Sequence, residues 1–345
     1  MLFVQKGRYL LRTFISIAIL VLIGSSVHAE EDFSLRFPAA LNRFSPYADV
    51  AAVGGASAGS KWQTSANPAS TGWQHIESNY RISLNPQYSL IHFREGATLH
   101  VITESITKEF DSLGTFQLSL AQVRSNESTS LQRLDFYYDM DFVQAQWGKK
   151  VTEDLAFGAN FNYSSSDMKY KAGSIDIAHS TSDSYGFRVG SLYRVIDHLL
   201  AGIVLDYSWT PSKTTYFDFF GPGLGDLRIN DTTRQYSIRT GPSYEYSKDS
   251  TINMDYQFAT FRNDTGKLDV HRYSAGIDHR IVDALFVRGG FTIDNSGRTS
   301  WTGGVGIYPL KQVSIDIGYQ YNMFPELRSE FGRSQLVTVS LSSTL

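Results

Sequence analysis

The sequence predicts an all-β protein: a transmembrane, antiparallel, up-and-down β-barrel of about 14 strands, with an N-terminal hatch segment in its lumen. Three observations lead to this prediction. They are an export signal at the N-terminus, long segments in which apolar and polar residues alternate, and connections that alternate between short and long. The chain therefore divides into a signal peptide over residues 1–29, a hatch segment over residues 30–79 and a barrel over residues 80–345.

Composition excludes several classes of protein. The chain has 345 residues, no cysteine, 42% hydrophobic residues, 19% charged residues and a formal net charge of −3. Soluble proteins average about 25% charged residues, yet the mean hydropathy of −0.22 is too low for a helical membrane protein. The absence of cysteine excludes disulfides and cysteine-based metal sites. The charge balance is not basic enough for nucleic-acid binding, so a soluble β-protein or a membrane barrel remains.

The N-terminus predicts export. Lys6, Arg8 and Arg12 precede an apolar run over residues 14–23, and small residues lead to a cleavage site after Ala29. The alternative is a membrane anchor, but a bilayer-spanning helix needs about 20 apolar residues. No later segment is apolar enough to span as a helix, so a membrane-embedded chain would cross with strands.

Alternation with a period of two identifies the strands. Over residues 313–323 the two faces separate completely, with Val313, Ile315, Ile317, Tyr319, Tyr321 and Met323 on one and Ser314, Asp316, Gly318, Gln320 and Asn322 on the other. The same pattern predicts strands over residues 80–93, 97–108, 113–125, 131–148, 155–171, 174–195, 199–214, 231–247, 251–263, 267–281, 284–296, 299–309, 313–325 and 333–345. Pro86 interrupts the first of them.

A soluble sandwich alternates too, so strand length and connections decide between the two. The segments are longer than the usual strands of about 5–6 residues, and aromatic residues gather towards their ends, as at Tyr207 and Trp209. Short turns, as at residues 196–198 and 248–250, alternate with longer connections, as at residues 215–230. Short periplasmic turns and longer outer loops are typical of outer-membrane barrels.

The polar face is expected to line the lumen and carries charges of both signs. It includes Asp135, Asp139, Asp141, Arg188, Asp206, Arg239, Asp255, Arg272, Asp278, Arg288 and Asp316. One interpretation is a hydrated lumen braced by ion pairs. The other is that one or two of Arg188, Arg239, Arg272 and Arg288 bind an anionic head group.

Residues 30–79 do not have the pattern of strands. Phe33 and Phe37 are followed by a small-residue stretch that contains Gly54 and Gly55, and then by a predicted tight turn at Asn67, Pro68 and Ala69. A 14-stranded barrel is too wide for its own side chains to fill. We therefore expect this segment to plug the bore, and a periplasmic tail is the alternative.

Together the signal peptide, the Gly54-Gly55 stretch, the Asn67-Pro68-Ala69 turn and the 14 strands resemble the FadL family of outer-membrane transporters of long-chain fatty acids and hydrocarbons. The resemblance implies that the N-terminal segment is a hatch and that the apolar loop with Phe217, Phe219, Phe220 and Leu224 helps to form a substrate groove. The other interpretation of this loop is that it folds onto the barrel rim or into lipopolysaccharide. Phe33 and Phe37 are candidate pocket contacts, and an inward arginine could pair with a carboxylate.

Uptake of hydrophobic compounds is the function that this resemblance implies. Two alternatives are a general polar porin and a FadL-like component of an assembly or secretion complex. An enzyme is not expected, since Ser296 lies in an ordinary turn without a neighbouring histidine. No catalytic residue, metal site or cofactor is predicted, because the eight histidines are scattered.

The resemblance also implies the location and partners. We expect a monomer in the outer membrane of a Gram-negative bacterium. Its partners would be hydrophobic small molecules, outer-membrane lipid, lipopolysaccharide and the barrel-assembly machinery, with no nucleic acid.

Overall fold

The structure is a computed structural model, and it describes residues 33–42, 44, 48–61, 63, 66–73, 75–76, 80–126, 128–129, 135–218, 225–310 and 312–345. The predicted signal peptide lies outside the described residues. Among the described helices, none combines the length and the apolar character needed to cross a bilayer.

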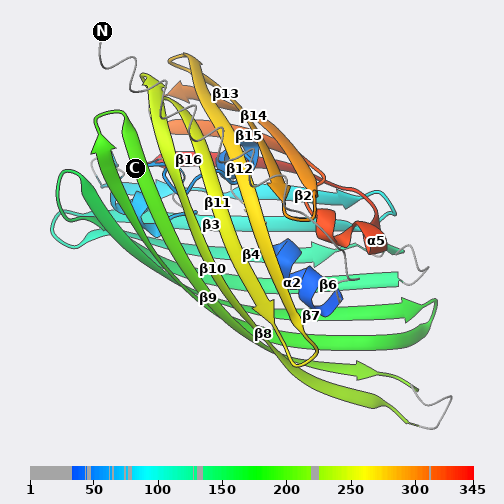
Figure 1. Cartoon of the computed structure of the whole chain (residues 1–345). Coiled ribbons are helices and arrows are strands. Elements are labelled where there is room, and N and C mark those ends of the chain that lie inside the picture. The colour runs from blue at the N-terminus through cyan, green and yellow to red at the C-terminus, as the bar shows by residue number, and fades with distance from the viewer. Residues whose placement is uncertain are drawn as a thin grey trace.

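The described strands form one closed antiparallel barrel with 14 positions in its wall, as predicted (Figure 1). β1 (Ile82–Leu84) and β2 (Gln87–Phe93) share the first position, because Asn85 and Pro86 separate them and both pair with β3 and β16. A short extra strand, β5 (Ser128–Thr129), pairs with β6 only. The remaining positions are β3 (Thr98–Phe110), β4 (Gly114–Ser125), β6 (Asp135–Lys150), β7 (Leu155–Ala172), β8 (Ile175–Ile196), β9 (Leu199–Tyr216), β10 (Leu227–Ser247), β11 (Ser250–Arg262), β12 (Lys267–Val282), β13 (Leu285–Asp294), β14 (Thr299–Leu310), β15 (Val313–Tyr321) and β16 (Ser334–Thr344).

The predicted boundaries differ from the observed ones at two connections. β10 begins at Leu227 rather than residue 231, because its first residues pair with β9 and lengthen the hairpin. β15 ends at Tyr321 rather than residue 325, because residues 322–333 turn inwards and form η1 (Pro325–Leu327) and α5 (Arg328–Phe331). Both differences lie at one end of the barrel, which we call the loop end. The opposite end, where β16 finishes and the short turns lie, is the turn end.

The barrel wall is much taller on one side than on the other (Figure 1). β8 and β10 have 22 and 21 residues, whereas β13 and β15 have 10 and 9. Since a strand rises about 3.3 Å per residue, the hairpins of β7–β10 extend well beyond the rest of the wall at the loop end.

The alternating faces are oriented as predicted on most strands. On β15 the side chains of Ile317 and Tyr319 are exposed on the outer wall, and those of Asp316 and Gln320 are buried inside. The prediction is wrong on β6, where Asp135, Asp139 and Asp141 lie on the outward face. The inward positions there belong to Phe136 and Tyr138, which are buried in an aromatic cluster at the loop end. A strand has only two faces, so burying these rings turns the acids outwards.

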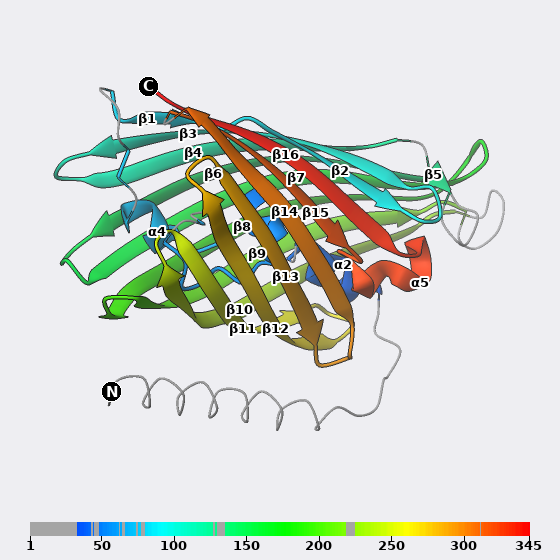
Figure 2. The ribbon, with the colours of Figure 1, turned by 90° about the horizontal axis from the view of Figure 1, so that it is seen from above.

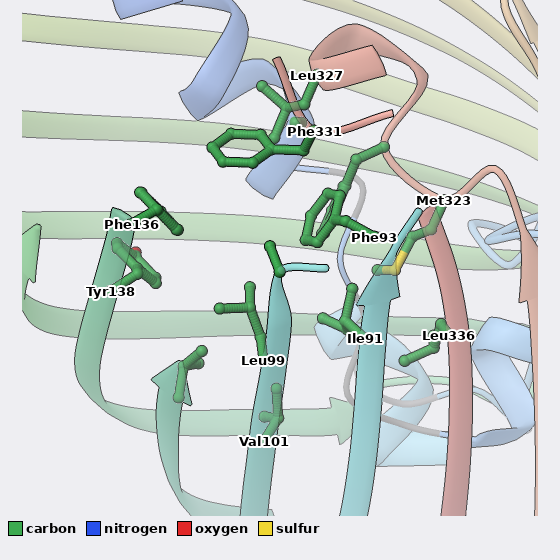
Figure 3. Packing of buried hydrophobic residues seen from close by; sticks show 14 of the residues in the cluster. Ile91, Phe93, Leu99, Val101, Phe136, Tyr138, Met323, Leu327, Phe331 and Leu336 are labelled. Carbon is green, nitrogen blue, oxygen red and sulfur yellow. The ribbon is translucent and has the colours of Figure 1, made fainter. Parts of the chain in front are cut away.

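The described N-terminal residues lie inside the ring of strands (Figure 2). They form α2 (Phe33–Leu41), α3 (Ala48–Ala52) and α4 (Pro68–Trp73). The largest buried cluster lies at the loop end, where residues 322–333 pack against β2, β3, β6 and β16 (Figure 3). Phe331 stacks near Phe93 and Phe136, with ring centroids 5.3 and 4.9 Å apart.

Candidate functional site

The N-terminal segment rests on inward-facing glycines of the wall, which we call the glycine collar. A Cβ atom added at Gly202 would lie 1.7 Å from the carbonyl oxygen of Ala58, and one added at Gly290 would lie 2.4 Å from the carbonyl carbon of Val53. Only glycine allows so close an approach. The collar occupies two runs of four neighbouring strands, β6–β9 and β12–β15. Its members are Gly148, Gly158, Gly190, Gly202, Gly276, Gly290, Gly304 and Gly318.

The predicted turn at Asn67, Pro68 and Ala69 begins helix α4. The Asn67 side-chain oxygen accepts a hydrogen bond from the Ala69 backbone N–H at 3.0 Å, and Pro68 occupies the first helical position. The Asn67 amide nitrogen donates to the carbonyl oxygens of Ala58 and Ser191, at 2.7 and 3.0 Å. Asn67 thus caps α4, joins it to the preceding turn and fastens both to β8.

Polar side chains of the wall bind the backbone of the N-terminal segment on β11, between the two runs of the collar, and on β13, within the second run. One carboxylate oxygen of Asp255 accepts hydrogen bonds from the backbone N–H groups of Ser57 and Ala58, each at 2.8 Å. The Thr292 hydroxyl donates to the carbonyl oxygen of Gly54 at 2.8 Å. Gly54 and Gly55 have φ angles of 67° and 74°, which a residue with a side chain rarely adopts.

A cavity of about 390 Å³ lies between the N-terminal segment and the wall. One side is apolar and is formed by α2, β4 and β6, with Phe37, Leu41, Val123, Tyr138, Met140 and Phe142. The other side is polar and is formed by β7–β11. It carries Arg188, Asp206, Arg239 and Asp255, together with the hydroxyl groups of Ser164, Ser166, Ser182, Ser184, Thr210 and Thr233. The cavity therefore suits a molecule with an apolar body and a polar end.

The four predicted arginines occupy different settings. Arg188 pairs with Asp206 and Arg272 pairs with Glu326, and both arginines line the cavity. Arg288 lies outside the cavity lining and pairs with Asp278 on the neighbouring strand β12 and with Asp316 on β15, the second strand on its other side. Arg239 lines the cavity within electrostatic range of Asp255 and Asp206, yet it has no hydrogen bond or ion pair to any described residue. Of the four, Arg239 has its guanidinium available for a ligand.

The predicted aromatic residues are distributed along the barrel rather than gathered at one site. Phe37 lines the cavity and contacts Tyr138, with ring centroids 5.4 Å apart. Phe33 packs against Phe37 and the loop-end cluster instead. Phe217 continues the pairing of β9 with β8 through its backbone N–H, which donates to the carbonyl oxygen of Ile177. Phe219, Phe220 and Leu224 lie outside the described residues.

Several lining residues were missed in the sequence. Tyr138, Met140 and Phe142 alternate with aspartates, so the polar-inside rule assigned the wrong face to them. The connection between the last two strands was predicted over residues 325–332, but residues 322–324 were assigned to the strand that ends in the structure at Tyr321. Within the described residues, no group of three or more His, Asp or Glu side chains could hold a metal ion.

Comparison with known proteins supports the fold. No protein-family model and no curated protein matches the sequence. Among solved structures, the toluene transporter TbuX from Ralstonia pickettii matches at 14% identity with a TM-score of 0.62, over 88% of this chain and 98% of that one. The monoaromatic hydrocarbon channel CymD matches at 14% identity with a TM-score of 0.61, over 88% and 98%.

A FadL homologue from Pseudomonas aeruginosa is similar in the same way. It matches at 13% identity with a TM-score of 0.58, over 87% of this chain and 99% of that one. These similarities cover nearly the whole length of each solved barrel, and they show that this chain has the FadL-type fold.

Proposed function

We propose that this chain, which has the FadL-type barrel fold, is an outer-membrane channel for the uptake of hydrophobic compounds such as long-chain fatty acids or hydrocarbons. The loop end would face the outside and the turn end the periplasm, since outer-membrane barrels place their short turns in the periplasm. The residue 1–29 signal peptide would direct export and be cleaved.

The observation that carries the proposal is the cavity between the N-terminal segment and the wall. An open pore would lack such a segment, whereas here residues 48–59 and 67–72 contact strands on both sides of the ring. The apolar side of the cavity, with Phe37, Leu41 and Phe142, would hold the hydrocarbon part of the cargo. The similar solved structures are named as toluene and monoaromatic hydrocarbon channels, which supports a hydrophobic cargo.

The polar side of the cavity supports a cargo with a head group. Arg239 lines the cavity and forms no ion pair with a described residue, so a carboxylate could accept two parallel hydrogen bonds from it without breaking one. The seryl and threonyl hydroxyls of β7–β10 would solvate the same group. A long-chain carboxylate therefore fits this cavity better than a neutral hydrocarbon.

Capture would begin at the apolar β9–β10 loop, which carries Phe217, Phe219, Phe220 and Leu224. Apolar side chains in an outer loop lower the cost of transferring a hydrophobic molecule out of water. The cargo would then pass along the tall β7–β10 wall into the cavity, and movement of the hatch segment would release it.

Equilibrium binding to the purified barrel tests the proposal. We expect a long-chain fatty acid to bind and Arg239→Gln to weaken its binding about 10- to 100-fold, the range of a lost charge-assisted hydrogen bond. The matching fatty alcohol should bind both proteins equally. Arg234→Gln is the control, because Arg234 lies on the same strand but is exposed on the outer face. Failure of both ligands to bind the unmodified protein would refute a hydrophobic cargo.

A further inference from the structure

The connection between β15 and β16, residues 322–333, folds into the mouth of the barrel (Figure 3). We call it the β15–β16 loop. Met323, Phe324, Leu327 and Phe331 are each at most 2% exposed. Phe324 and Phe331 both contact Phe93 on β2, with ring centroids 5.9 and 5.3 Å apart. The loop thus covers part of the loop end instead of extending into solvent.

Helix α2 is fastened directly to this loop through Arg36. The Arg36 guanidinium donates to the carbonyl oxygen of Glu326 at 2.9 Å and to the hydroxyl of Ser329 at 2.8 Å, and it forms an ion pair with Glu330. One side chain of α2 therefore makes three contacts with the loop. The partly buried setting of the ion pair protects it from screening by salt.

Arg272 on β12 holds the same two elements to the wall. Its guanidinium donates to the carbonyl oxygen of Ala39 in the last turn of α2 at 2.6 Å, and it pairs with the buried carboxylate of Glu326 at 3.1 Å. It also donates to the side chain of Asn42, just after α2, at 2.9 Å. Because one guanidinium binds both elements, moving either one away from β12 disturbs the contacts of the other.

The rest of the N-terminal segment is held differently. Residues 48–59 and 67–72 lie on the glycine collar mostly through backbone-to-backbone contacts, whereas α2 contacts the wall through small side chains such as Ala39 and through Leu35. Helix α2 also forms part of the cavity boundary, where Phe37, Pro38 and Leu41 line it. The N-terminal segment therefore consists of a fixed part over the collar and a separately held helix beside the cavity.

We propose that α2 and the β15–β16 loop form a single gate at the loop end, joined by Arg36 and latched to the wall by Arg272. The two elements move together when the cavity is loaded, while residues 48–72 remain on the collar. This inference rests on the proposed function only in that the cavity is loaded from the loop end.

Hydrogen exchange of backbone amides, measured on the full barrel in detergent without cargo, tests the gate. Glu330→Arg places two like charges together and breaks the link between α2 and the loop. We expect it to raise exchange at least tenfold, and by a similar factor, in residues 33–42 and in residues 322–333. Amides of residues 48–61 and 66–73 should keep their wild-type rates.

Charge reversal supplies the controls. The double variant Arg36→Glu/Glu330→Arg restores an opposite-charge pair but not the hydrogen bond to the Glu326 carbonyl oxygen. We therefore expect its exchange to be at least threefold slower than in Glu330→Arg, in both segments alike, although faster than in the wild type. Arg328→Glu changes the charge of α5 by the same amount in the opposite direction, at an exposed position with no described contact to α2, and should leave both segments unchanged. Faster exchange in the loop alone, or no recovery in the double variant, would overturn the single gate.

Uptake by proteoliposomes separates this inference from the proposed function. Coupled exchange with no uptake of a long-chain fatty acid would support the gate and refute the proposed cargo. Uptake with independent exchange of the two segments would support the cargo and refute the gate.

Discussion

At each glycine of the collar, the methyl group that an alanine would add would collide with the N-terminal segment. Neighbouring residues on β13 make this testable. A Cβ atom at Gly290 would lie 2.4 Å from Val53, whereas at Gly289, which faces outwards, the nearest atoms would lie 3.9 Å away. Neither glycine has a positive φ, so only the available space distinguishes the two positions.

We expect Gly290→Ala to lower the free energy of unfolding by about 1–3 kcal/mol, the usual cost of overpacking. Residues near Val53 should also become accessible to protease. Urea unfolding in detergent and limited proteolysis measure the two effects. Gly289→Ala is the matched control and should change neither. Equal destabilisation in both variants would show that the strand, and not its contact with Val53, requires glycine.

At the scale of an element, α4 is short and depends on its first residues. A helix of six residues is too short to be stable by itself. Asn67 caps it and fastens it to Ala58 and Ser191. The sequence signals the turn through Asn67 and Pro68, but the carbonyl partner on β8 lies 124 residues away and has no local signature.

We expect Asn67→Ala to leave one N–H group and two carbonyl groups without their partner, at about 1–3 kcal/mol for an unsatisfied buried group. Amide exchange in residues 68–73 should accelerate while the barrel strands remain protected. Asn230→Ala on β10, where the side chain is exposed, is the control. Unchanged protection of α4 in Asn67→Ala would mean that the collar alone positions this helix.

The strands show which features of single elements could be predicted from the sequence. All 14 wall positions were predicted, including the interruption at Pro86, because alternation and proline chemistry are local properties. The error on β6 has a physical cause. Phe136 and Tyr138 enter the buried cluster at the loop end, and because successive side chains of a strand point to opposite faces, Asp139 and Asp141 lie outside.

At the scale of the whole molecule, the bore is occupied by a segment that contacts strands around the ring. We expect the intact protein in planar bilayers to have a near-closed baseline. Deletion of residues 33–73 should produce a large, steady current, because a 14-stranded barrel without a plug is open. As a control, the deletion variant should migrate as a compact, folded species in unheated gels, which shows that its barrel has assembled. A large steady current from the intact protein would favour a general polar porin.

The sequence by itself determined the class of fold, the number of wall positions and the existence of an N-terminal segment unlike the rest. Each of these follows from composition, from a period of two or from turn residues, and all are readable within a short window of the chain. The resemblance to FadL-type barrels arose from the same local features, and the solved structures support it at the level of fold.

Only the tertiary structure decided which of the inward-facing charged side chains form ion pairs with one another. Arg188, Arg239, Arg272 and Arg288 are alike in sequence, but three form ion pairs with acidic residues brought together by strand register or by a loop, whereas Arg239 forms none with a described residue. The glycine collar and the link from Arg36 to Glu330 likewise join residues far apart in the chain. Closing a barrel fixes these pairings through the stagger of all its strands together, so no local pattern could have revealed them.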